Sequence, residues 1–213
     1  LKDHKKTLKT IKPWTKDRNR HVRRLVSEGS RPLLPWSPRI GAFVDDPLLI
    51  LPLLELLRHD KEEYVRRSVA NNLNDIAKHH PDLVAETATL WLQGASKDEQ
   101  RMVRHACRTL LKQGHPGTLS AFGYGDVKLD VEAFDIENPA IKLGQQLTFD
   151  LTLKSTSNEP QPLMIDYIVH HRKANGTTSP KVFKWKTLTL KPGEEMVARK
   201  KHAIKPITTR VYY

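Results

Sequence analysis

The chain has 213 residues, and 36 Lys and Arg stand against 24 Asp and Glu, which gives a formal net charge of +12. This surplus of positive charge favours a polyanionic partner, for which nucleic acid is the natural candidate. An apolar content of 38% suits a folded chain rather than a disordered one, and the length allows one or two ordinary cores. We expect two domains.

The single cysteine, Cys107, excludes a disulfide within the chain and points to a reducing compartment, so we expect a cytoplasmic protein. We expect its side chain to be a small buried residue of a helix. No apolar run is long enough to span a bilayer, which favours a protein without a membrane partner. The adjacent pairs His79-His80 and His170-His171 lack the spacing of metal ligands, so we predict no metal and no cofactor.

From about His4 to Gln113 the apolar residues recur at the spacing of helices. The segment "DPLLILPLLELLRHD", residues 46–60, predicts one short, nearly all-apolar helix opened by Asp46 and Pro47. Three stretches of this half are alike, namely "HVRRLVSEG" at 21–29, "YVRRSVANN" at 64–72 and "MVRHACRTL" at 102–110. They are about 40 residues apart, which is the period of HEAT-type helical pairs, so we predict a helical solenoid over residues 1–120.

From Val127 onward the pattern changes to alternation, as in "LTFDLTLKS" at 147–155 and "KVFKWKTLTL" at 181–190. Turn signals interrupt it at Asn138-Pro139, Ser157-Asn158, Asn175-Gly176 and Pro192-Gly193. We therefore predict an antiparallel β domain over residues 127–213, and the basic hairpin around Asn175-Gly176 either grips DNA or is solvated. The Gly-rich segment "QGHPGTLSAFGYGD", residues 113–126, closes the helical part and joins the two domains.

Two of the similar helices carry a polar stripe, read at about 100° per residue. In the first helix the side chains of Val22, Leu25 and Val26 are expected to face the core, with Arg24, Glu28 and Arg31 opposite. In the second helix the core stripe is Val65, Val69, Leu73 and Ile76, and the opposite face carries Arg67, Asn71 and Asp75, with Asn74 and Lys78 beside them. Glu28 and Asp75 thus lie on equivalent faces, and we predict that they converge on one concave groove.

A structural interpretation of these charges competes with a functional one. Pairs of Arg and Glu four residues apart are usually a solvated helix face of little energetic worth, and HEAT repeats often use Asp and Arg in ladders between repeats. The segment "RPLLPWSPR", residues 31–39, breaks the first helix with prolines and places Trp36 close to the helix end that bears Glu28. A buried core position is the commoner fate of a tryptophan.

The stretches "HVRRLVSEGSRPLLPW" (21–36), "EYVRRSVANNLNDIAKHHPDLV" (63–84) and "VRHACRTLLKQGHP" (103–116) resemble the AlkC subfamily of HEAT-like DNA alkylation-repair glycosylases. The resemblance implies a HEAT-like α-solenoid followed by an immunoglobulin-like antiparallel β-sandwich, that is, α and β structure in separate domains. It also implies excision of cationic N3-alkylated bases, such as 3-methyladenine and 3-methylcytosine, from double-stranded DNA in base excision repair. Such an enzyme needs no cofactor, and we expect a monomer.

In this family the positions matching Glu28, Asp75 and Trp36 belong to the active site, and those matching Arg24 and Arg31 contact DNA. We add Arg39 and the stripe residues Arg67, Asn71 and Lys78 as DNA-binding candidates. A further acidic residue of the family's site lies upstream of this sequence, which begins at Leu1 without a methionine. We therefore expect the helical domain to lack its N-terminal repeats.

Two other classes remain open. A non-catalytic HEAT-repeat scaffold would bind nucleic acid through a basic concave face and would tolerate Glu28→Gln and Asp75→Asn. A secreted carbohydrate-active protein with an immunoglobulin-like module is disfavoured by the lone cysteine and by the lack of a leader in the sequence.

Overall fold

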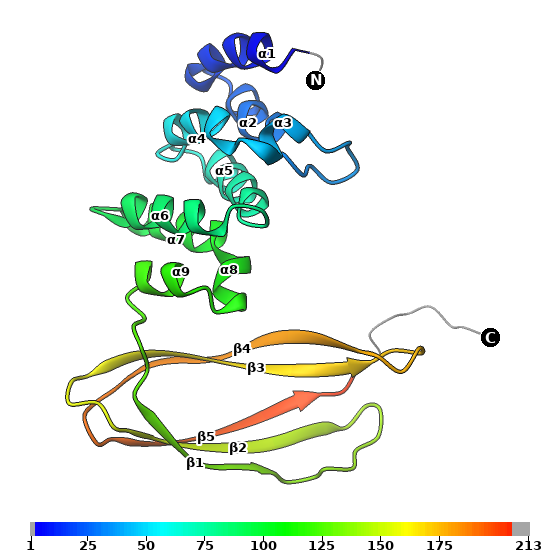
Figure 1. Ribbon diagram of the computed structural model, residues 1–213, viewed down its shortest axis with the longest axis vertical. Coiled ribbons are helices and arrows are strands. Elements are labelled where there is room, and N and C mark those ends of the chain that lie inside the picture. Colours follow the sequence, from blue (N-terminus) through cyan, green and yellow to red (C-terminus); the bar gives the residue numbers. More distant parts are fainter. Residues whose placement is uncertain (1–2, 206–213) are drawn as a thin grey trace. The chain divides into compact units, whose positions relative to one another are not determined.

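The computed structural model describes residues 3–205 of the 213-residue chain. This part divides between Gly123 and Tyr124 into two compact units. The first unit is helical and the second consists of antiparallel strands (Figure 1). None of the described helices is long and apolar enough to cross a membrane.

Short helices follow one another closely in the first unit. Their bounds are α1 His4–Ile11, the 3₁₀ helix η1 Lys12–Lys16, α2 Arg20–Gly29, α3 Gly41–Asp45, the 3₁₀ helix η2 Pro47–Leu49, α4 Leu51–Leu57, α5 Glu63–Ile76, α6 Pro81–Leu92, α7 Lys97–Ala106, α8 Arg108–Gln113 and α9 Pro116–Ala121.

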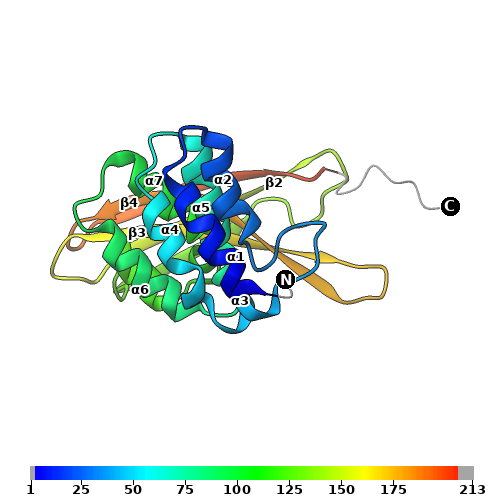
Figure 2. The same cartoon turned by 90° about the horizontal axis from the view of Figure 1, so that it is seen from above.

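The helices form two layers. Seen along the stack, α2, α5 and α7 lie on one side, and α3, α4 and α6 lie on the other (Figure 2). The three similar stretches fall on α2, α5 and α7, and α5 packs against both α2 and α7. Neighbouring repeats therefore meet through equivalent helices, as the repeat pattern predicts.

The apolar stripe of α5 is the centre of this core. Val65, Val69, Leu73 and Ile76 are all buried, as predicted. Cys107, between α7 and α8, is also buried, and burial raises the pKa of its thiol to about 12. It is thus the inert structural thiol expected from the sequence.

A ladder of arginine–aspartate pairs links successive repeats. Arg23 of α2 donates to both carboxylate oxygens of Asp60, at 2.5 and 3.0 Å, and the equivalent Arg66 of α5 donates to Asp98 at 2.7 Å. Each arginine also donates to two backbone carbonyls of the loop before its own helix. The structural ladder of this solenoid is therefore made by Arg23, Asp60, Arg66 and Asp98.

This ladder corrects the predicted core face of α2. Leu25 is 53% exposed, whereas Arg23 and Ser27 are buried together with Val26. The buried face is rotated because Arg23 must reach Asp60 across the interface with the next repeat. On α5 the alternative of a solvated helix face does not hold for Asn74 and Asp75, since both are buried.

Two segments differ in detail from the predictions. Residues 46–60 form not one helix but η2, capped by Asp46, followed by α4. A second proline, Pro52, lies in the first turn of α4, where a missing N–H is tolerated. The Gly-rich segment is not all linker, because Pro116 begins α9 within it.

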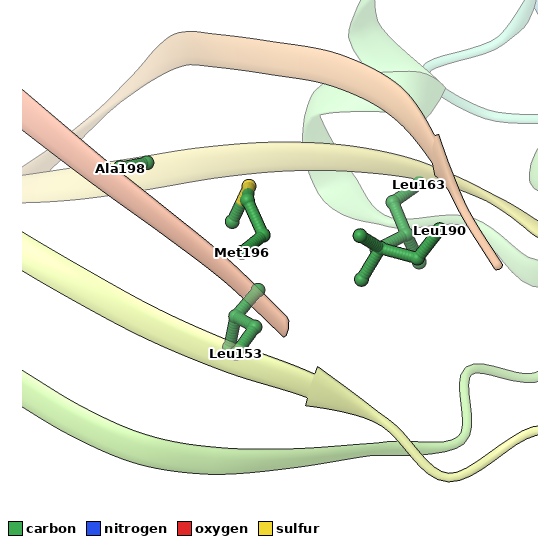
Figure 3. Packing of buried hydrophobic residues seen from close by; sticks show 5 residues of the cluster. All are labelled: Leu153, Leu163, Leu190, Met196 and Ala198. Atoms are coloured by element: carbon green, nitrogen blue, oxygen red, sulfur yellow. The ribbon is translucent and has the colours of Figure 1, made fainter. Parts of the chain in front are cut away.

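The second unit packs two sheets face to face. Strands β1 (Leu129–Ile136), β2 (Gln146–Ser155) and β5 (Glu195–Ala203) form one sheet, and β3 (Gln161–Arg172) and β4 (Thr178–Leu190) form the other. All neighbouring strands are antiparallel. The core between the sheets contains Leu153, Leu163, Leu190, Met196 and Ala198 (Figure 3). The four predicted turns all fall between strands, which confirms the antiparallel β assignment.

Candidate active site

Glu28 and Asp75 meet on one guanidinium group. Arg31 donates from Nε to Asp75 Oδ2 at 2.8 Å and from Nη1 to Glu28 Oε1 at 2.8 Å. Glu28 comes from the last turn of α2 and Asp75 from the last turns of α5, so the cluster joins two repeats. The structure thus brings together the two carboxylates that the sequence placed on equivalent helix faces.

The end of α2 is tied down by α5, and this places Arg31. Asn72 of α5 donates to the carbonyl of Ser27 at 2.8 Å and to the hydroxyl of Ser30 at 3.1 Å. Ser30, the residue after α2, in turn donates to the carbonyl of Val26 at 2.7 Å. Because these side chains satisfy polar groups that the helix end leaves open, the turn carrying Arg31 has a defined conformation.

Glu28 is held as an anion by donors on three sides. Its Oε2 accepts from the Ser68 hydroxyl at 2.7 Å and lies 3.2 Å from Arg24, while Arg31 takes Oε1. Burial by itself raises the pKa of Glu28, but the hydrogen bonds from Ser68 and Arg31 and the two positive charges outweigh it. The pKa of Glu28 is therefore below its ordinary value, and the group is ionised at neutral pH.

Asp75 is the more enclosed of the two acids. Its side chain is 4% exposed, against 19% for Glu28. Besides Arg31 it accepts from Lys78 at 3.1 Å, and Lys78 lies one turn further along the chain. Arg67, the arginine of the polar stripe on α5, does not pair with Asp75; the cations at Asp75 are Arg31 and Lys78.

This cluster is separate from the repeating ladder. The ladder uses the first arginine of the Val-Arg-Arg motif in both α2 and α5, namely Arg23 and Arg66, so it occurs in successive repeats. Counting 43 residues onward, the counterparts of Glu28 and Arg31 in the second repeat are Asn71 and Asn74, which carry no charge. The Glu28–Arg31–Asp75 cluster is therefore not copied there, as repeating structural support would be.

Trp36 lies in the loop between α2 and α3, which projects from the helical stack (Figure 1). Its side chain is fully exposed, so the buried core position that is commoner for tryptophan is wrong here. It is also the one non-glycine among residues 3–205 with a positive φ, at 64°. Backbone strain of this kind clusters at active and binding sites, which is consistent with a binding role for Trp36.

The other DNA-binding candidates differ in their surroundings. Arg24 lies over the ring of Tyr64, at 4.6 Å from its centroid, besides pairing with Glu28. Arg39 is exposed beyond Trp36 in the same loop, and Arg67 is exposed on α5. Asn71 is engaged within the protein, since its Oδ1 accepts from Arg108 at 3.2 Å and lies 3.2 Å from His105 Nε2.

Sequence reasoning missed a group of cations contributed by the third repeat. His105 of α7 and Arg108 of α8 stand near Arg67, whose charge disfavours the charged form of each. Burial comes first in lowering the pKa of His105 and of Arg108, and the neighbouring arginines add to it. Within residues 3–205, neither Arg67 nor Arg108 has a carboxylate at ion-pair distance.

The repeat alignment offered a signal for part of this group, because His105 in "MVRHACRTL" occupies the place of Arg67. A cleft of about 290 Å³ between α5 and α7 is lined by both residues, together with Arg66 and Arg101 and the acids Glu63 and Asp98. No three His, Cys, Asp or Glu side chains in the described part of the chain are grouped so as to hold a metal ion.

The class of protein to which the chain belongs follows from its fold and from the family models that it matches. Residues 130–213 match the model of the C-terminal Ig-like domain of YhaZ, an uncharacterised protein, and residues 1–111 match the model described as DNA alkylation repair enzyme. The chain is thus a helical protein with a C-terminal immunoglobulin-like β domain, as predicted. It belongs to the family of DNA alkylation repair enzymes, which confirms the resemblance seen in the three helical stretches.

Two relatives match the whole chain. Over 214 residues it is 38% identical to the uncharacterized protein YhaZ of Bacillus subtilis strain 168. It is 39% identical, with a TM-score of 0.91, to a solved structure of the Pseudomonas fluorescens alkylpurine DNA glycosylase AlkC bound to DNA that contains an abasic site analog. The chain spans 59% of the length of each of these two proteins.

Proposed function

We propose that the full-length protein is a DNA glycosylase that hydrolyses the N-glycosidic bond of cationic N3-alkylated bases, such as 3-methyladenine and 3-methylcytosine, in double-stranded DNA. The observation that carries the proposal is the convergence of Glu28 and Asp75 on Arg31, beside a loop that exposes Trp36. The likeness to an alkylpurine DNA glycosylase bound to DNA supports it.

The chemistry explains why acids belong in a basic protein. An N3-alkylated base already carries a positive charge, so it leaves the sugar as a neutral group and needs no proton. Positive charge instead develops on the deoxyribose, and a fixed carboxylate stabilises it more than it stabilises the ground state. A second carboxylate can orient the attacking water, as in glycoside hydrolysis.

We assign the following roles to the proposed site residues. Glu28 and Asp75 supply the two negative charges, and Trp36 lies against the cationic nucleotide or its sugar. Arg24, Arg31 and Lys78 touch the carboxylates in the structure and hold flanking phosphates when DNA is bound. Arg39 and Arg67, both exposed, add further phosphate contacts.

The test is release of base by the full-length protein from DNA treated with a methylating agent, with separation of 3-methyladenine and 3-methylcytosine from other products. We expect both to be released, and unmodified bases to be retained. A folded protein that binds this DNA but releases no base contradicts the proposal.

A non-catalytic DNA-binding protein is the second candidate. It is favoured by the ion pairs themselves, because each carboxylate is already partnered by cations and so contributes to holding α2 against α5. Glu28→Gln separates the two candidates. An enzyme releases base as the wild type and loses most of this release in the variant, whereas a binder releases no base in either form and keeps or improves its affinity for duplex DNA.

Trp36→Ala is expected to weaken DNA binding and base release together, each by about 2- to 30-fold, the equivalent of roughly 0.5 to 2 kcal/mol for a cation–aromatic contact. The melting temperature should hardly change, because the side chain is fully exposed. Binding titrations, release rates and thermal melts measure the three quantities. Trp36→Phe keeps an aromatic face and should retain most of both activities; equal losses in the two variants would contradict a stacking role.

Binding to undamaged duplex DNA is expected to be mainly electrostatic, with log affinity falling against log salt by about 0.9 per phosphate neutralised. Arg67→Ala should reduce this slope by about 0.9, since it removes an exposed cation of α5 to which we assign a phosphate contact. Arg58→Ala on α4, where Arg58 pairs with Glu55, is the matched control and should leave the slope unchanged. Affinity that is flat from low to high salt contradicts the prediction.

A further inference from the structure

Two buried serines stand behind Glu28. The hydroxyl of Ser68, on α5, donates to Glu28 Oε2 at 2.7 Å. The hydroxyl of Ser27, on α2, lies 2.9 Å from the Ser68 hydroxyl and 3.0 Å from the carbonyl of Arg24. Both serines are buried at the interface between the two helices. They form a short chain of hydroxyls that ends on the carboxylate.

The direction of this chain follows from what each group can do. An ionised carboxylate only accepts hydrogen bonds, so Ser68 must donate its one hydroxyl proton to Glu28. The oxygen of Ser68 is then left to accept from Ser27, whose single proton is shared between Ser68 and the carbonyl of Arg24. Because neither serine is open to water, no solvent molecule competes for these positions.

Ser68 differs from the arginines in one physical respect. Arg24 and Arg31 stabilise the Glu28 anion by charge, which also cancels part of the field that the anion exerts on a substrate. A hydroxyl donor stabilises the anion without placing a further positive charge beside it. When a DNA phosphate draws the arginines away, the hydrogen bond from Ser68 remains.

We infer that Ser68, held by Ser27, is a positioning residue that keeps Glu28 ionised and correctly oriented during base release. The inference rests on the proposed function of the site. Nothing in the chemistry of Ser68 itself is needed for the reaction, because its hydroxyl contacts Glu28 and not the substrate.

The charged neighbours of Glu28 determine how far its pKa changes when the Ser68 hydroxyl is removed. Arg24 and Arg31 face it from α2 and the turn that follows, and Asp75 faces it from α5 through Arg31. After burial, which acts the other way, the hydrogen bond from Ser68 is the largest influence on the pKa of Glu28. Removal of this bond therefore raises the pKa while both arginines stay in place.

The experiment is Ser68→Ala in the full-length protein, with two readouts. The titration midpoint of the Glu28 carboxyl, followed by carbon NMR, should move to higher pH. The acidic limb of the kcat profile should move up by the same amount, and kcat at neutral pH should fall about tenfold with KM unchanged, as for a slightly misplaced reacting group. Ser68→Thr keeps the hydroxyl and should restore the midpoint.

Ser27→Ala removes the hydroxyl that holds Ser68 but leaves the donor to Glu28, so the Glu28 midpoint should move in the same direction as in Ser68→Ala and by less. Should Ser68→Ala unfold, Ser68→Cys carries the same test, because a thiol of similar size is a weaker donor. An unmoved Glu28 midpoint in the folded variant overturns the inference. A wild-type protein that releases no base refutes the proposed function instead, and the carboxyl titration still decides the role of Ser68.

Discussion

Asp75→Asn in the full-length protein is expected to lower the release of N3-methylated bases by about 10²- to 10³-fold, the usual cost of one electrostatic contact to a transition state. The substitution keeps the shape of the side chain but removes its negative charge. It thereby withdraws stabilisation from the sugar cation and relieves repulsion of the phosphates. Affinity for undamaged duplex DNA should be unchanged or slightly higher.

Single-turnover release and binding titrations on the same preparation measure the two quantities. Asp60→Asn is the matched control, because Asp60 is also a buried aspartate paired with an arginine, but it belongs to the structural ladder. Where it remains folded, it should release base at the wild-type rate. If Asp75→Asn unfolds the protein, Asp75 is structural; if the folded variant releases base at the original rate, its assignment to the site is wrong.

Asp60→Asn is itself expected to lower the free energy of unfolding by about 3 to 5 kcal/mol, as when one partner of a buried ion pair is removed. The side chains of Arg23 and Asp60 are only 8% and 5% exposed, so the variant leaves a positive charge buried without its counterion. Urea unfolding followed by the helical signal of circular dichroism measures the loss. Asp98→Asn, at the half-exposed next step of the ladder, should cost much less. Equal losses in the two variants would contradict this account of the ladder.

The Arg23–Asp60 ion pair makes part of the free energy of unfolding depend on pH. Burial raises the pKa of Asp60, but the hydrogen bonds from Arg23 and from the backbone of Glu62, with the charges of Arg23 and Arg66, outweigh it and hold the pKa below its ordinary value. The stabilisation is therefore fully present above the pKa of an unfolded aspartate, about 3.9, and is lost as the pH falls through the folded pKa. The difference between wild type and Asp60→Asn should shrink in acid.

The sequence by itself determined which part of the chain is helical and which part forms strands, because periodicity is a local property of the chain. The helical spacing of Val65, Val69, Leu73 and Ile76 is the core of α5, and the alternation after Val127 gives the strands. The repeated Val-Arg stretches predicted which helices are equivalent, and their resemblance to a known family predicted the two-part architecture. The sequence also singled out Glu28 and Asp75, whose positions on equivalent faces of two helices follow from helical geometry alone.

Only the tertiary structure decided which charges meet. Arg31 reaches Asp75 across 44 residues of sequence, Arg23 reaches Asp60 across 37, and Ser68 reaches Glu28 across 40. Periodicity fixes the face of a helix on which a side chain lies. The partner of that side chain depends on how two helices pack, because sliding one helix by one residue along the other changes which side chains meet. Helix packing also explains why Leu25 is exposed while Arg23 is buried. The buried face of α2 is the one that lets Arg23 pair with Asp60 across the interface, and this face does not coincide with the apolar stripe of the sequence.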